Sequence, residues 1–347
     1  ALPCHGRGPG LESLYPHQFS LYIKSPALGL FCYHECMKAF VFDPLWDELV
    51  TDKLLAKLKD AGVELAVTKD IAPISDCEAL FAGDEERILC VNPDYVGWKL
   101  TVDDYKDIPN LKAILGAATS FSWIDASYAN DNRITIANVR NFSTQAVAEW
   151  AITMLLNLAR QTPRLIKDNF PLDFDKDFMK YRGIEIKGKT AGIIGLGHNG
   201  TAIAERLKGL GLNVIYWSKD TRNGEYEYRE LAELFETADV IVPAFAHNDE
   251  TDAIINDELL TKVKSSAIFV DIIELKNKDK IIELVGTGKL FGYGFEAEPE
   301  HFNKYEGNIW AAPAYGWVTD GSMNNMMTKW IDNIVDAVSG HYPNRIN

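Results

Sequence analysis

The chain has 347 residues, of which 47% are hydrophobic and 24% are charged, and its formal net charge is −15. This balance is typical of a globular protein and excludes an intrinsically disordered chain. The acidic excess argues against a nucleic-acid or anionic-membrane partner, because both kinds of surface need a basic face. No apolar run in the sequence approaches the length of a membrane span.

Residues 1–36 differ from the rest of the chain. They are rich in glycine and proline and lack a hydrophobic period, and at Met37 the pattern changes abruptly to the strand-like MKAFVFD. We interpret residues 1–36 as a leader, a tag or translated upstream sequence. Side chains there that could imitate a metal site are His5, His17, Cys32, His34 and Cys36. Their spacing fits no structural zinc pattern, so we expect no metal.

Cysteine usage bears on the compartment of the protein. The chain has five cysteines, an odd number that is sparsely placed in a long sequence. This pattern fits a reducing compartment better than a disulfide scaffold, so we expect a cytoplasmic protein.

From Met37 onward, apolar strand patterns alternate with amphipathic helix patterns. The expected strands are Lys38–Phe42, Val63–Val67, Ile88–Val91 and Leu111–Leu115, with a helix over Leu45–Ala61. Such alternation builds a parallel sheet with helices on both faces. No phosphate-binding turn occurs here, so we assign residues 37–140 together with 323–347 to a substrate domain. Residues 141–322 are assigned to a dinucleotide-binding domain.

A long apolar helix is expected at the start of the second domain. In Asn141–Gln161, Ser143 or Thr144 can cap a helix whose apolar residues then recur at helical spacing. A helix this apolar buries more than one face, against the other domain or a second subunit. We expect Pro163 to stop it.

The second half of the chain is organised around one strand–turn–helix–strand unit. An apolar run, Thr190–Leu196, leads directly into a glycine-rich turn. Thr201–Leu210 then has apolar residues on one helix face, and a second apolar run, Asn213–Trp217, follows. This context raises a short glycine motif from weak to strong evidence for a dinucleotide site.

Each glycine of the turn has an expected role. Gly195 permits the tight turn, Gly197 lets the backbone approach a pyrophosphate, and Gly200 lets the helix pack against the strand. The intervening His198 and Asn199 are assigned to the cofactor site as well, and the His198 side chain should face the phosphates or solvent. The alternative is an ordinary strand–helix turn that uses glycine only for packing.

The end of the Asn213–Trp217 strand bears on the choice of dinucleotide. NAD sites usually place an acidic residue there, whereas this chain has Ser218, followed by Lys219, Asp220 and Arg222. Ser218 would not repel a 2′-phosphate, and Lys219 and Arg222 could pair with one. We therefore expect NADP rather than NAD, with NAD left open because Asp220 opposes a phosphate.

The alternation continues to the C-terminus. Helices are expected at Tyr228–Glu236, Asp257–Val263 and Asp279–Gly286, and strands at Asp239–Ala244, Ala267–Asp271, Leu290–Phe295 and Trp310–Ala312. Six strands from Thr190 onward match a doubly wound dinucleotide domain. The amphipathic segment Met323–Val338 is expected to return to the first domain. The predicted fold is α/β, with a Rossmann NAD(P)-binding domain and a smaller flavodoxin-like substrate domain, both doubly wound parallel sheets.

The chain from Met37 onward resembles the D-isomer-specific 2-hydroxyacid dehydrogenases. The residues that carry the resemblance are Phe142-Ser-Thr-Gln-Ala-Val-Ala-Glu149, Lys187–Gly197, Gly292-Tyr-Gly-Phe-Glu296 with Glu298-Pro299, and Asn308 with Pro313, Gly316 and Trp317. The resemblance implies two domains with cofactor and substrate between them, and a homodimer made through the nucleotide domains. It also implies hydride transfer between a nicotinamide and a 2-hydroxy acid.

The catalytic pattern of that family is only partly present. The family uses an arginine for the substrate carboxylate and a histidine paired with a glutamate as acid/base. Where the arginine is expected the chain has Glu274, with Lys276 as the nearest cation, and the histidine position holds Ala314. The acidic partner is matched by Glu298, and Glu296 stands where the family has an aspartate near the nicotinamide.

Other residues could take over these roles. Tyr315 could donate a proton to a carbonyl oxygen, or else simply pack beside Trp317. His247 lies on a loop that should edge the cofactor, and it is either a base or a polar loop residue. Thr119 and Ser120 match the family's substrate-holding loop, although a plain turn is equally compatible with them.

Three functions remain open from the sequence. The favoured hypothesis is an NAD(P)-dependent oxidoreductase with an altered, neutral carbonyl or hydroxy substrate, because Glu274 would repel a carboxylate. The second is a catalytically inactive dinucleotide-sensing or regulatory protein. The third is an ordinary 2-hydroxy acid dehydrogenase that uses Lys276 and an unrecognised base.

Overall fold

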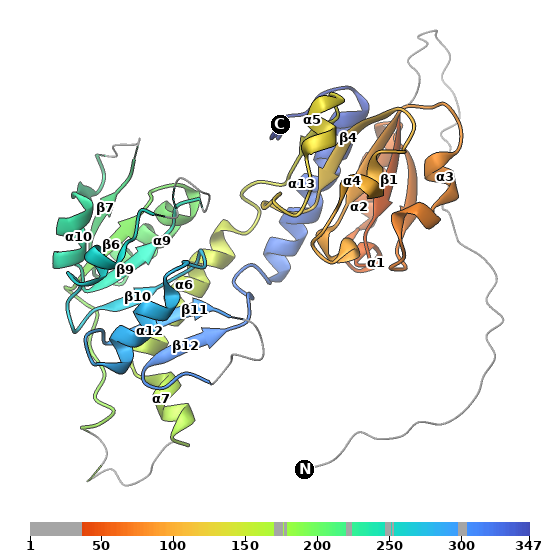
Figure 1. Cartoon of the computed structure of the whole chain (residues 1–347). Helices are drawn as coiled ribbons and strands as arrows, with labels where there is room; N and C mark the ends of the chain where they lie inside the picture. The colour runs from red at the N-terminus through yellow and green to blue at the C-terminus, as the bar shows by residue number, and fades with distance from the viewer. Residues whose placement is uncertain are drawn as a thin grey trace, which may run out of the picture. The chain divides into compact units, whose positions relative to one another are not determined.

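The computed structural model describes residues 37–169, 176, 179–219, 224–246, 251, 253–297 and 304–347. Contacts divide the chain into two compact units (Figure 1). Unit 1 comprises the chain up to Arg140 together with Met327–Asn347, and unit 2 is Asn141–Met326. From the sequence, the second boundary between the two parts was expected between residues 322 and 323, and the boundary between the units lies between Met326 and Met327. The roles assigned to the two parts, substrate and dinucleotide binding, stay predictions.

Unit 1 is built on a parallel sheet, five-stranded within the described residues, in the order β2-β1-β3-β4-β5. Its strands are β1 (Lys38–Phe42), β2 (Glu64–Thr68), β3 (Arg87–Val91), β4 (Leu111–Gly116) and β5 (Thr135–Ala137). This is the strand order of flavodoxin. The connecting helices are α1 (Trp46–Leu49), α2 (Asp52–Asp60), α3 (Glu78–Phe81), α4 (Val102–Tyr105) and α5 (Ser127–Asp131).

The sheet of unit 1 is covered on both faces. Phe40, Phe42 and Leu89 pack into one cluster beneath the α3–α5 connections. The long C-terminal helix α13 (Asp320–Val338) belongs to the same unit from Met327 onward. Its fully buried Trp330 donates an indole N–H to the Leu115 carbonyl of β4 at 3.1 Å. The C-terminal helix thus completes the core of a unit whose strands lie near the other end of the sequence.

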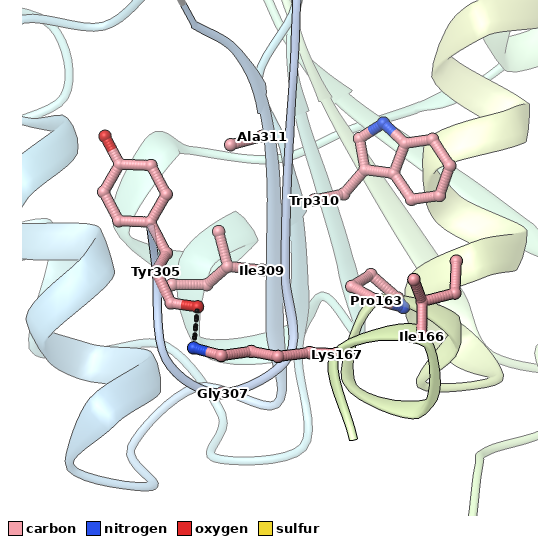
Figure 2. A pocket seen from close by; sticks show the side chains of 8 residues that line it. All are labelled: Pro163, Ile166, Lys167, Tyr305, Gly307, Ile309, Trp310 and Ala311. Atoms are coloured by element: carbon pink, nitrogen blue, oxygen red, sulfur yellow. Dashed lines mark hydrogen bonds between the residues drawn. The ribbon is translucent and has the colours of Figure 1, made fainter. Parts of the chain in front are cut away.

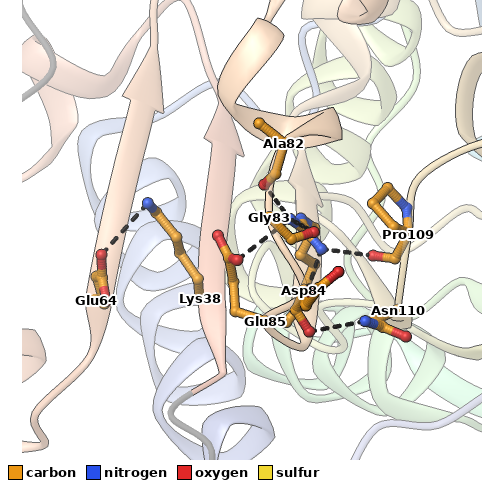
Figure 3. A network of polar contacts seen from close by, with 9 residues as sticks. Lys38, Glu64, Ala82, Gly83, Asp84, Glu85, Pro109 and Asn110 are labelled. Carbon is orange, nitrogen blue, oxygen red and sulfur yellow. Dashed lines mark hydrogen bonds and ion pairs between the residues drawn. The ribbon is translucent and has the colours of Figure 1, made fainter.

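A buried arginine fixes the amino-terminal edge of this sheet. The fully buried guanidinium of Arg87 donates to the carbonyls of Ala82, Gly83, Glu85 and Pro109, and Figure 3 shows the polar network around these carbonyls. The Gly83 and Pro109 bonds are both 2.9 Å long. One side chain therefore ties the loop before β3 to the loop before β4.

Unit 2 contains a parallel sheet, seven-stranded over the described residues, in the order β12-β11-β10-β9-β6-β7-β8. Its strands are β6 (Thr190–Ile194), β7 (Asn213–Trp217), β8 (Glu227–Tyr228), β9 (Val240–Pro243), β10 (Ile268–Val270), β11 (Gly292–Glu296) and β12 (Ile309–Ala312). The chain reverses direction across the sheet between β6 and β9. Ligands of open α/β sheets bind at the carboxyl ends of strands at such a switch point.

Helices cover both faces of the second sheet. Ala191 and Ile193 of β6 join the cluster formed with α6 (Thr144–Ala159) and α9 (His198–Gly209). Ile194 joins the opposite cluster. The helices on that opposite face are α10 (Leu231–Thr237), α11 (Asp257–Leu260) and α12 (Lys278–Gly286). Both sheets are therefore doubly wound, and the predicted fold class is confirmed.

Two boundary predictions for helices in this part of the chain were wrong, although both helices are present, as α6 and α10. Tyr228 lies in the short edge strand β8 rather than in a helix, which raises the strand count of this sheet above the predicted six over the described residues. Pro163 does not stop α6. That helix ends at Ala159, Gln161 turns the chain with φ +53°, and Pro163 lies in the first turn of α7 (Thr162–Lys167), where its missing N–H has no cost.

The predicted helix Leu45–Ala61 is in fact two helices. The chain leaves the first at Val50, with φ −90° and ψ 114°, and begins the second after Thr51, with φ −86° and ψ 160°. Two consecutive β-branched residues favour this extended break, and threonine is a common residue before a helix start.

Candidate functional site

The glycine turn joins β6 to α9 at the switch point of unit 2. Gly195 has φ +95°, and a Cβ there would lie 2.9 Å from the Phe245 backbone. A Cβ on Gly200 would lie 2.0 Å from the Gly195 carbonyl oxygen. These two glycines are therefore required by the protein's own packing, since Gly195 makes the turn and Gly200 lets α9 approach it.

Gly197 differs from its two neighbours. It precedes α9 with φ −79°, a value that any residue adopts, and a Cβ built on it meets no atom within 4 Å. Nothing in the described residues therefore requires a glycine at this position. The space that a Cβ would occupy lies at the first turn of a helix, where free N–H groups attract phosphate, and it suits the close approach of a pyrophosphate.

An open pocket of about 450 Å³ lies over this turn; we call it the turn pocket. Its lining residues are Thr144, Gln145, Leu196, Gly197, His198, Thr201, Ala202 and Glu205. Two helices thus contribute, α6 through its first residues and α9 through its first two turns. Asn199, also predicted at the cofactor, is half-buried in the first turn of α9.

The residues that would discriminate the dinucleotide follow β7. Ser218 is half-buried and Lys219 is exposed. Gly195 donates its N–H to the carbonyl of Trp217, the last residue of β7, at 2.8 Å, so Ser218 lies next to the glycine turn along the sheet edge. Arg222, the other cation predicted to hold a 2′-phosphate, lies outside the described residues.

Carboxylates gather at the carboxyl edge of β10 and β11. The buried Asp271 follows β10 and accepts hydrogen bonds of 2.9 Å from the N–H groups of Ile273 and Leu275 and from the Tyr293 hydroxyl. Burial raises the pKa of Asp271 despite these donors. The same turn carries Glu274, which is exposed, has φ +58° and lies 3.6 Å from Lys278.

Glu296 ends β11 beside this turn. Its Oε1 accepts the Gly316 N–H at 3.1 Å, and a Cβ on Gly316 would lie 2.9 Å from that oxygen. Burial is the main cause that raises the pKa of Glu296, and the charges of Asp271 and Glu274 act in the same direction. The glutamate therefore fixes the loop after β12, which carries Ala314 and Tyr315.

Tyr315 is 62% exposed. The nearby Trp317 ring makes an edge contact with Phe142, at 6.3 Å between ring centroids. The role of Tyr315 stays a prediction. His247 and Glu298, the other predicted acid/base residues, lie outside the described residues.

The predicted substrate loop follows β4 in unit 1. Thr119 and Ser120 are both exposed at the carboxyl end of this strand. The Thr119 hydroxyl donates to the Val139 carbonyl at 2.8 Å, and the Ser120 hydroxyl lies 3.3 Å from that of Ser122. These contacts hold the loop in place, and Phe121, which follows Ser120, is 49% exposed beside them.

A further hollow of about 60 Å³ lies between α7 and the edge strand β12, as Figure 2 shows. Its lining is largely apolar, with Ile166, Ile309 and Trp310, and Lys167 donates to the Tyr305 carbonyl at 3.1 Å across its mouth. It contains none of the predicted site residues. We therefore assign it no part in the chemistry.

Comparison with known proteins identifies the family. The profile of the D-isomer specific 2-hydroxyacid dehydrogenase, NAD binding domain, matches residues 152–314. The glyoxylate reductase of Thermococcus kodakarensis is 30% identical over 259 residues, which cover 68% of this chain and 76% of that protein. The chain belongs to the D-isomer-specific 2-hydroxyacid dehydrogenase family.

Solved structures share the fold of this family member. A glyoxylate reductase from Paecilomyes thermophila has a TM-score of 0.73 at 20% identity, covering 89% of this chain and 98% of that one. An acyclic imino acid reductase in complex with NADPH and D-Arg has a TM-score of 0.71 at 22% identity, covering 90% of this chain and 100% of that one. At these identities the likeness concerns the fold alone.

Family membership confirms two expectations, the class of enzyme and the nicotinamide cofactor. This 2-hydroxyacid dehydrogenase homologue is an oxidoreductase of the nicotinamide-dependent class, and the matched segment is the NAD-binding domain. Within the described residues, no helix combines the length and apolar character needed to cross a bilayer, and no group of three His, Cys, Asp or Glu side chains is arranged as a metal site. The individual catalytic, substrate and cofactor residues stay predictions.

Several residues of the site were missed in the sequence analysis. Asn141 and Gln145 come to the glycine turn only through the packing of α6 and the residues before it on α9, whereas Glu205 lies on α9 itself. No local pattern signals this packing. Asp271 could have been found, because it directly follows an apolar strand at the carboxyl edge of the sheet.

Proposed function

We propose that this family member reduces a small carbonyl compound with a nicotinamide dinucleotide, and oxidises the corresponding alcohol in reverse, using substrate-holding and acid/base groups that differ from those of the family. The observation that carries the proposal is the open space over Gly197. No atom of the described residues lies within 4 Å of a Cβ built there, so packing alone does not explain the glycine. It lies at a helix start on a Rossmann switch point, the place where a pyrophosphate binds.

The substrate class follows from charge at the carboxyl edge of β10 and β11. The position that resembles the family's carboxylate-binding arginine carries Glu274, whose carboxylate lies near Asp271 and Glu296. A substrate carboxylate placed there meets negative charge, so a neutral ketone or aldehyde is favoured. The relatives named glyoxylate reductase support the competing candidate, a 2-oxo acid held by Lys276.

Tyr315 is the proposed proton donor. When bound, the nicotinamide supplies the hydride. The Tyr315 hydroxyl transfers its proton to the carbonyl oxygen, and Glu296 positions the Tyr315 loop through the Gly316 N–H. His247 and Glu298 are the alternative acid/base groups, and Thr119 and Ser120 are proposed to orient a polar substituent of the substrate.

The finer assignments belong to the same proposal. Ser218, Lys219 and Arg222 favour NADP over NAD, because none of the three repels a 2′-phosphate and two are cations. The resemblance to the family supports a homodimer, and the sparse cysteines support a cytoplasmic location.

The first experiment measures binding and turnover separately. NADH and NADPH are titrated by fluorescence into the wild type and into Gly197→Ala, and a panel of ketones, aldehydes and 2-oxo acids follows. We expect tighter binding of NADPH, reduced binding in Gly197→Ala, and oxidation of the cofactor by a neutral carbonyl. Tyr315→Phe should lower kcat by about 10²-fold or more without changing the Kd of the cofactor.

The other outcomes separate the alternatives. Tight binding without turnover across the panel would establish a dinucleotide-sensing protein. Turnover of 2-oxo acids alone, lost in Lys276→Met, would establish an ordinary 2-hydroxy acid dehydrogenase. Failure to bind either dinucleotide would overturn the proposal altogether.

A further inference from the structure

The turn pocket has little positive charge for a site that receives a pyrophosphate. Among the described residues that line it, Glu205 carries a negative charge, His198 can become positive, and the rest are uncharged. Phosphate sites usually supply lysine or arginine as well as helix N–H groups. Among these lining residues, only a proton on His198 can therefore add positive charge to the pocket.

Charged groups on the elements packed around His198 are already engaged with each other. Arg206 of α9 donates to the Gln145 side chain at 2.6 Å and pairs with Glu149 of α6 at 3.2 Å. Its guanidinium is thus held on the α6 side of the helix. Glu205 remains as an acid on the pocket lining, where it stabilises a positive charge nearby and disfavours an unneutralised phosphate.

The geometry of His198 allows both protonation states. The side chain is exposed on the first residue of α9, and its Nε2 lies 3.3 Å from the Asn141 amide nitrogen. With Asn141 as the donor, this contact needs a neutral ring with an acceptor lone pair. A protonated ring carries N–H donors on both nitrogens, so it gives up this contact and can donate to a phosphate oxygen instead.

We propose that His198 takes up a proton when the pyrophosphate of a dinucleotide binds in the turn pocket. The pyrophosphate is fully ionised at neutral pH, so the change of charge comes from the imidazole. Cofactor affinity is then higher at acidic than at alkaline pH, because the protonated imidazole adds a positive charge beside the pyrophosphate. This inference rests on the proposed function, because it assumes the dinucleotide site at the glycine turn.

Calorimetry on the full chain tests the proton uptake directly. The probe is ADP-ribose, which carries the pyrophosphate but lacks the nicotinamide and the 2′-phosphate, a group that itself titrates near neutrality. Titrations in buffers of different ionisation enthalpy give the number of protons bound with the ligand. We expect net proton uptake at neutral pH and a Kd that rises by about tenfold between about pH 6 and about pH 8, the range in which an imidazole loses its charge.

Two variants assign the effect to this side chain. His198→Gln should bind at every pH as weakly as the wild type does at the alkaline limit, with no proton uptake. His198→Arg should bind tightly at every pH, again with no uptake. His341→Gln is the matched control, since His341 is exposed beyond α13 in unit 1, and it should retain the wild-type pH profile.

The outcomes separate this inference from the proposed function. A pH-independent Kd in the wild type, or a pH dependence that persists in His198→Gln or disappears instead in His247→Gln, would overturn the role of His198 while leaving the dinucleotide site intact. Failure of ADP-ribose, NADH and NADPH to bind at any pH would overturn the site itself.

Discussion

Gly197 and Gly200 stand three residues apart in one turn, but the structure needs them for different reasons. A side chain on Gly200 would collide with a backbone carbonyl that cannot move without unmaking the turn. A side chain on Gly197 would meet nothing within the described residues. The first glycine is thus a packing requirement, and the second is explained by a ligand.

This difference predicts opposite behaviour of two matched variants. Gly197→Ala should leave the unfolding free energy within about 0.5 kcal/mol of wild type, since it is an unstrained surface substitution. It should nevertheless weaken the binding of ADP-ribose, because the methyl group occupies the phosphate space. Gly200→Ala should cost roughly 1–3 kcal/mol through overpacking against the turn.

Denaturant unfolding and calorimetry measure both quantities in the same samples. If Gly197→Ala binds ADP-ribose as well as the wild type, the space over this residue is not the phosphate site.

Glu296 predicts a pH dependence of stability. Its pKa is raised in the fold, mainly by burial, so the folded protein holds a proton that the unfolded chain has already released. The contribution of this group to stability is therefore full below its ordinary value of 4.5 and is lost as the pH rises through the higher folded pKa. Glu296→Gln keeps the acceptor for the Gly316 N–H and stays neutral.

Denaturant unfolding of the wild type and of Glu296→Gln, measured from acidic to neutral pH, tests the sign of this pH dependence of stability. Glu296→Gln should match the wild type at acidic pH and become the more stable protein as the pH rises above the window. A wild type that gains stability over Glu296→Gln with rising pH would contradict the burial argument.

At the scale of elements, the features that could be predicted are those that depend on residues close together in the sequence. The strand pattern of Asn213–Trp217 coincides with β7, and the glycine spacing located the turn, because both depend on consecutive residues. The strands β5 and β8 were missed because they are too short to show a period. The residues that α6 brings to the turn pocket depend on tertiary packing, which local pattern does not encode.

The strand β3 is held by sheet pairing and, in addition, by the contacts of its first residue, Arg87. Its guanidinium donates to carbonyls of two loops and is fully buried. Arg87→Met should therefore leave several carbonyls without donors and destabilise the protein by at least about 1–3 kcal/mol, the cost of leaving a buried acceptor unsatisfied. Lys106→Met, which removes an exposed ion pair with Asp103, should change stability by less than about 1 kcal/mol.

Thermal unfolding of the two variants gives the comparison. Equal destabilisation by both would mean that the carbonyls around Arg87 are satisfied by water rather than by the arginine.

At the scale of the molecule, the two units have separate cores, so damage to one should be distinguishable from damage to the other. Trp330 belongs to unit 1 and Tyr216 to unit 2, and both are fully buried. Trp330→Ala should destabilise unit 1 by about 3–5 kcal/mol and leave the binding of ADP-ribose unchanged. Tyr216→Ala should destabilise unit 2 and weaken binding.

Hydrogen exchange with mass spectrometry, combined with calorimetry, resolves the two cases by segment. Loss of ADP-ribose binding in Trp330→Ala under conditions where β6 and α9 stay protected would show that the ligand site depends on unit 1.

The contribution of α13 to unit 1 sets an order of events during synthesis of the chain. Strands β1–β5 leave the ribosome before unit 2, but the helix whose Trp330 donates to the Leu115 carbonyl is made after it. All residues of unit 2 up to Met326 emerge in between and can fold around their own core. The core of unit 1 is therefore completed only after unit 2 has been translated, and the sheet face that α13 covers needs protection from aggregation until that helix emerges.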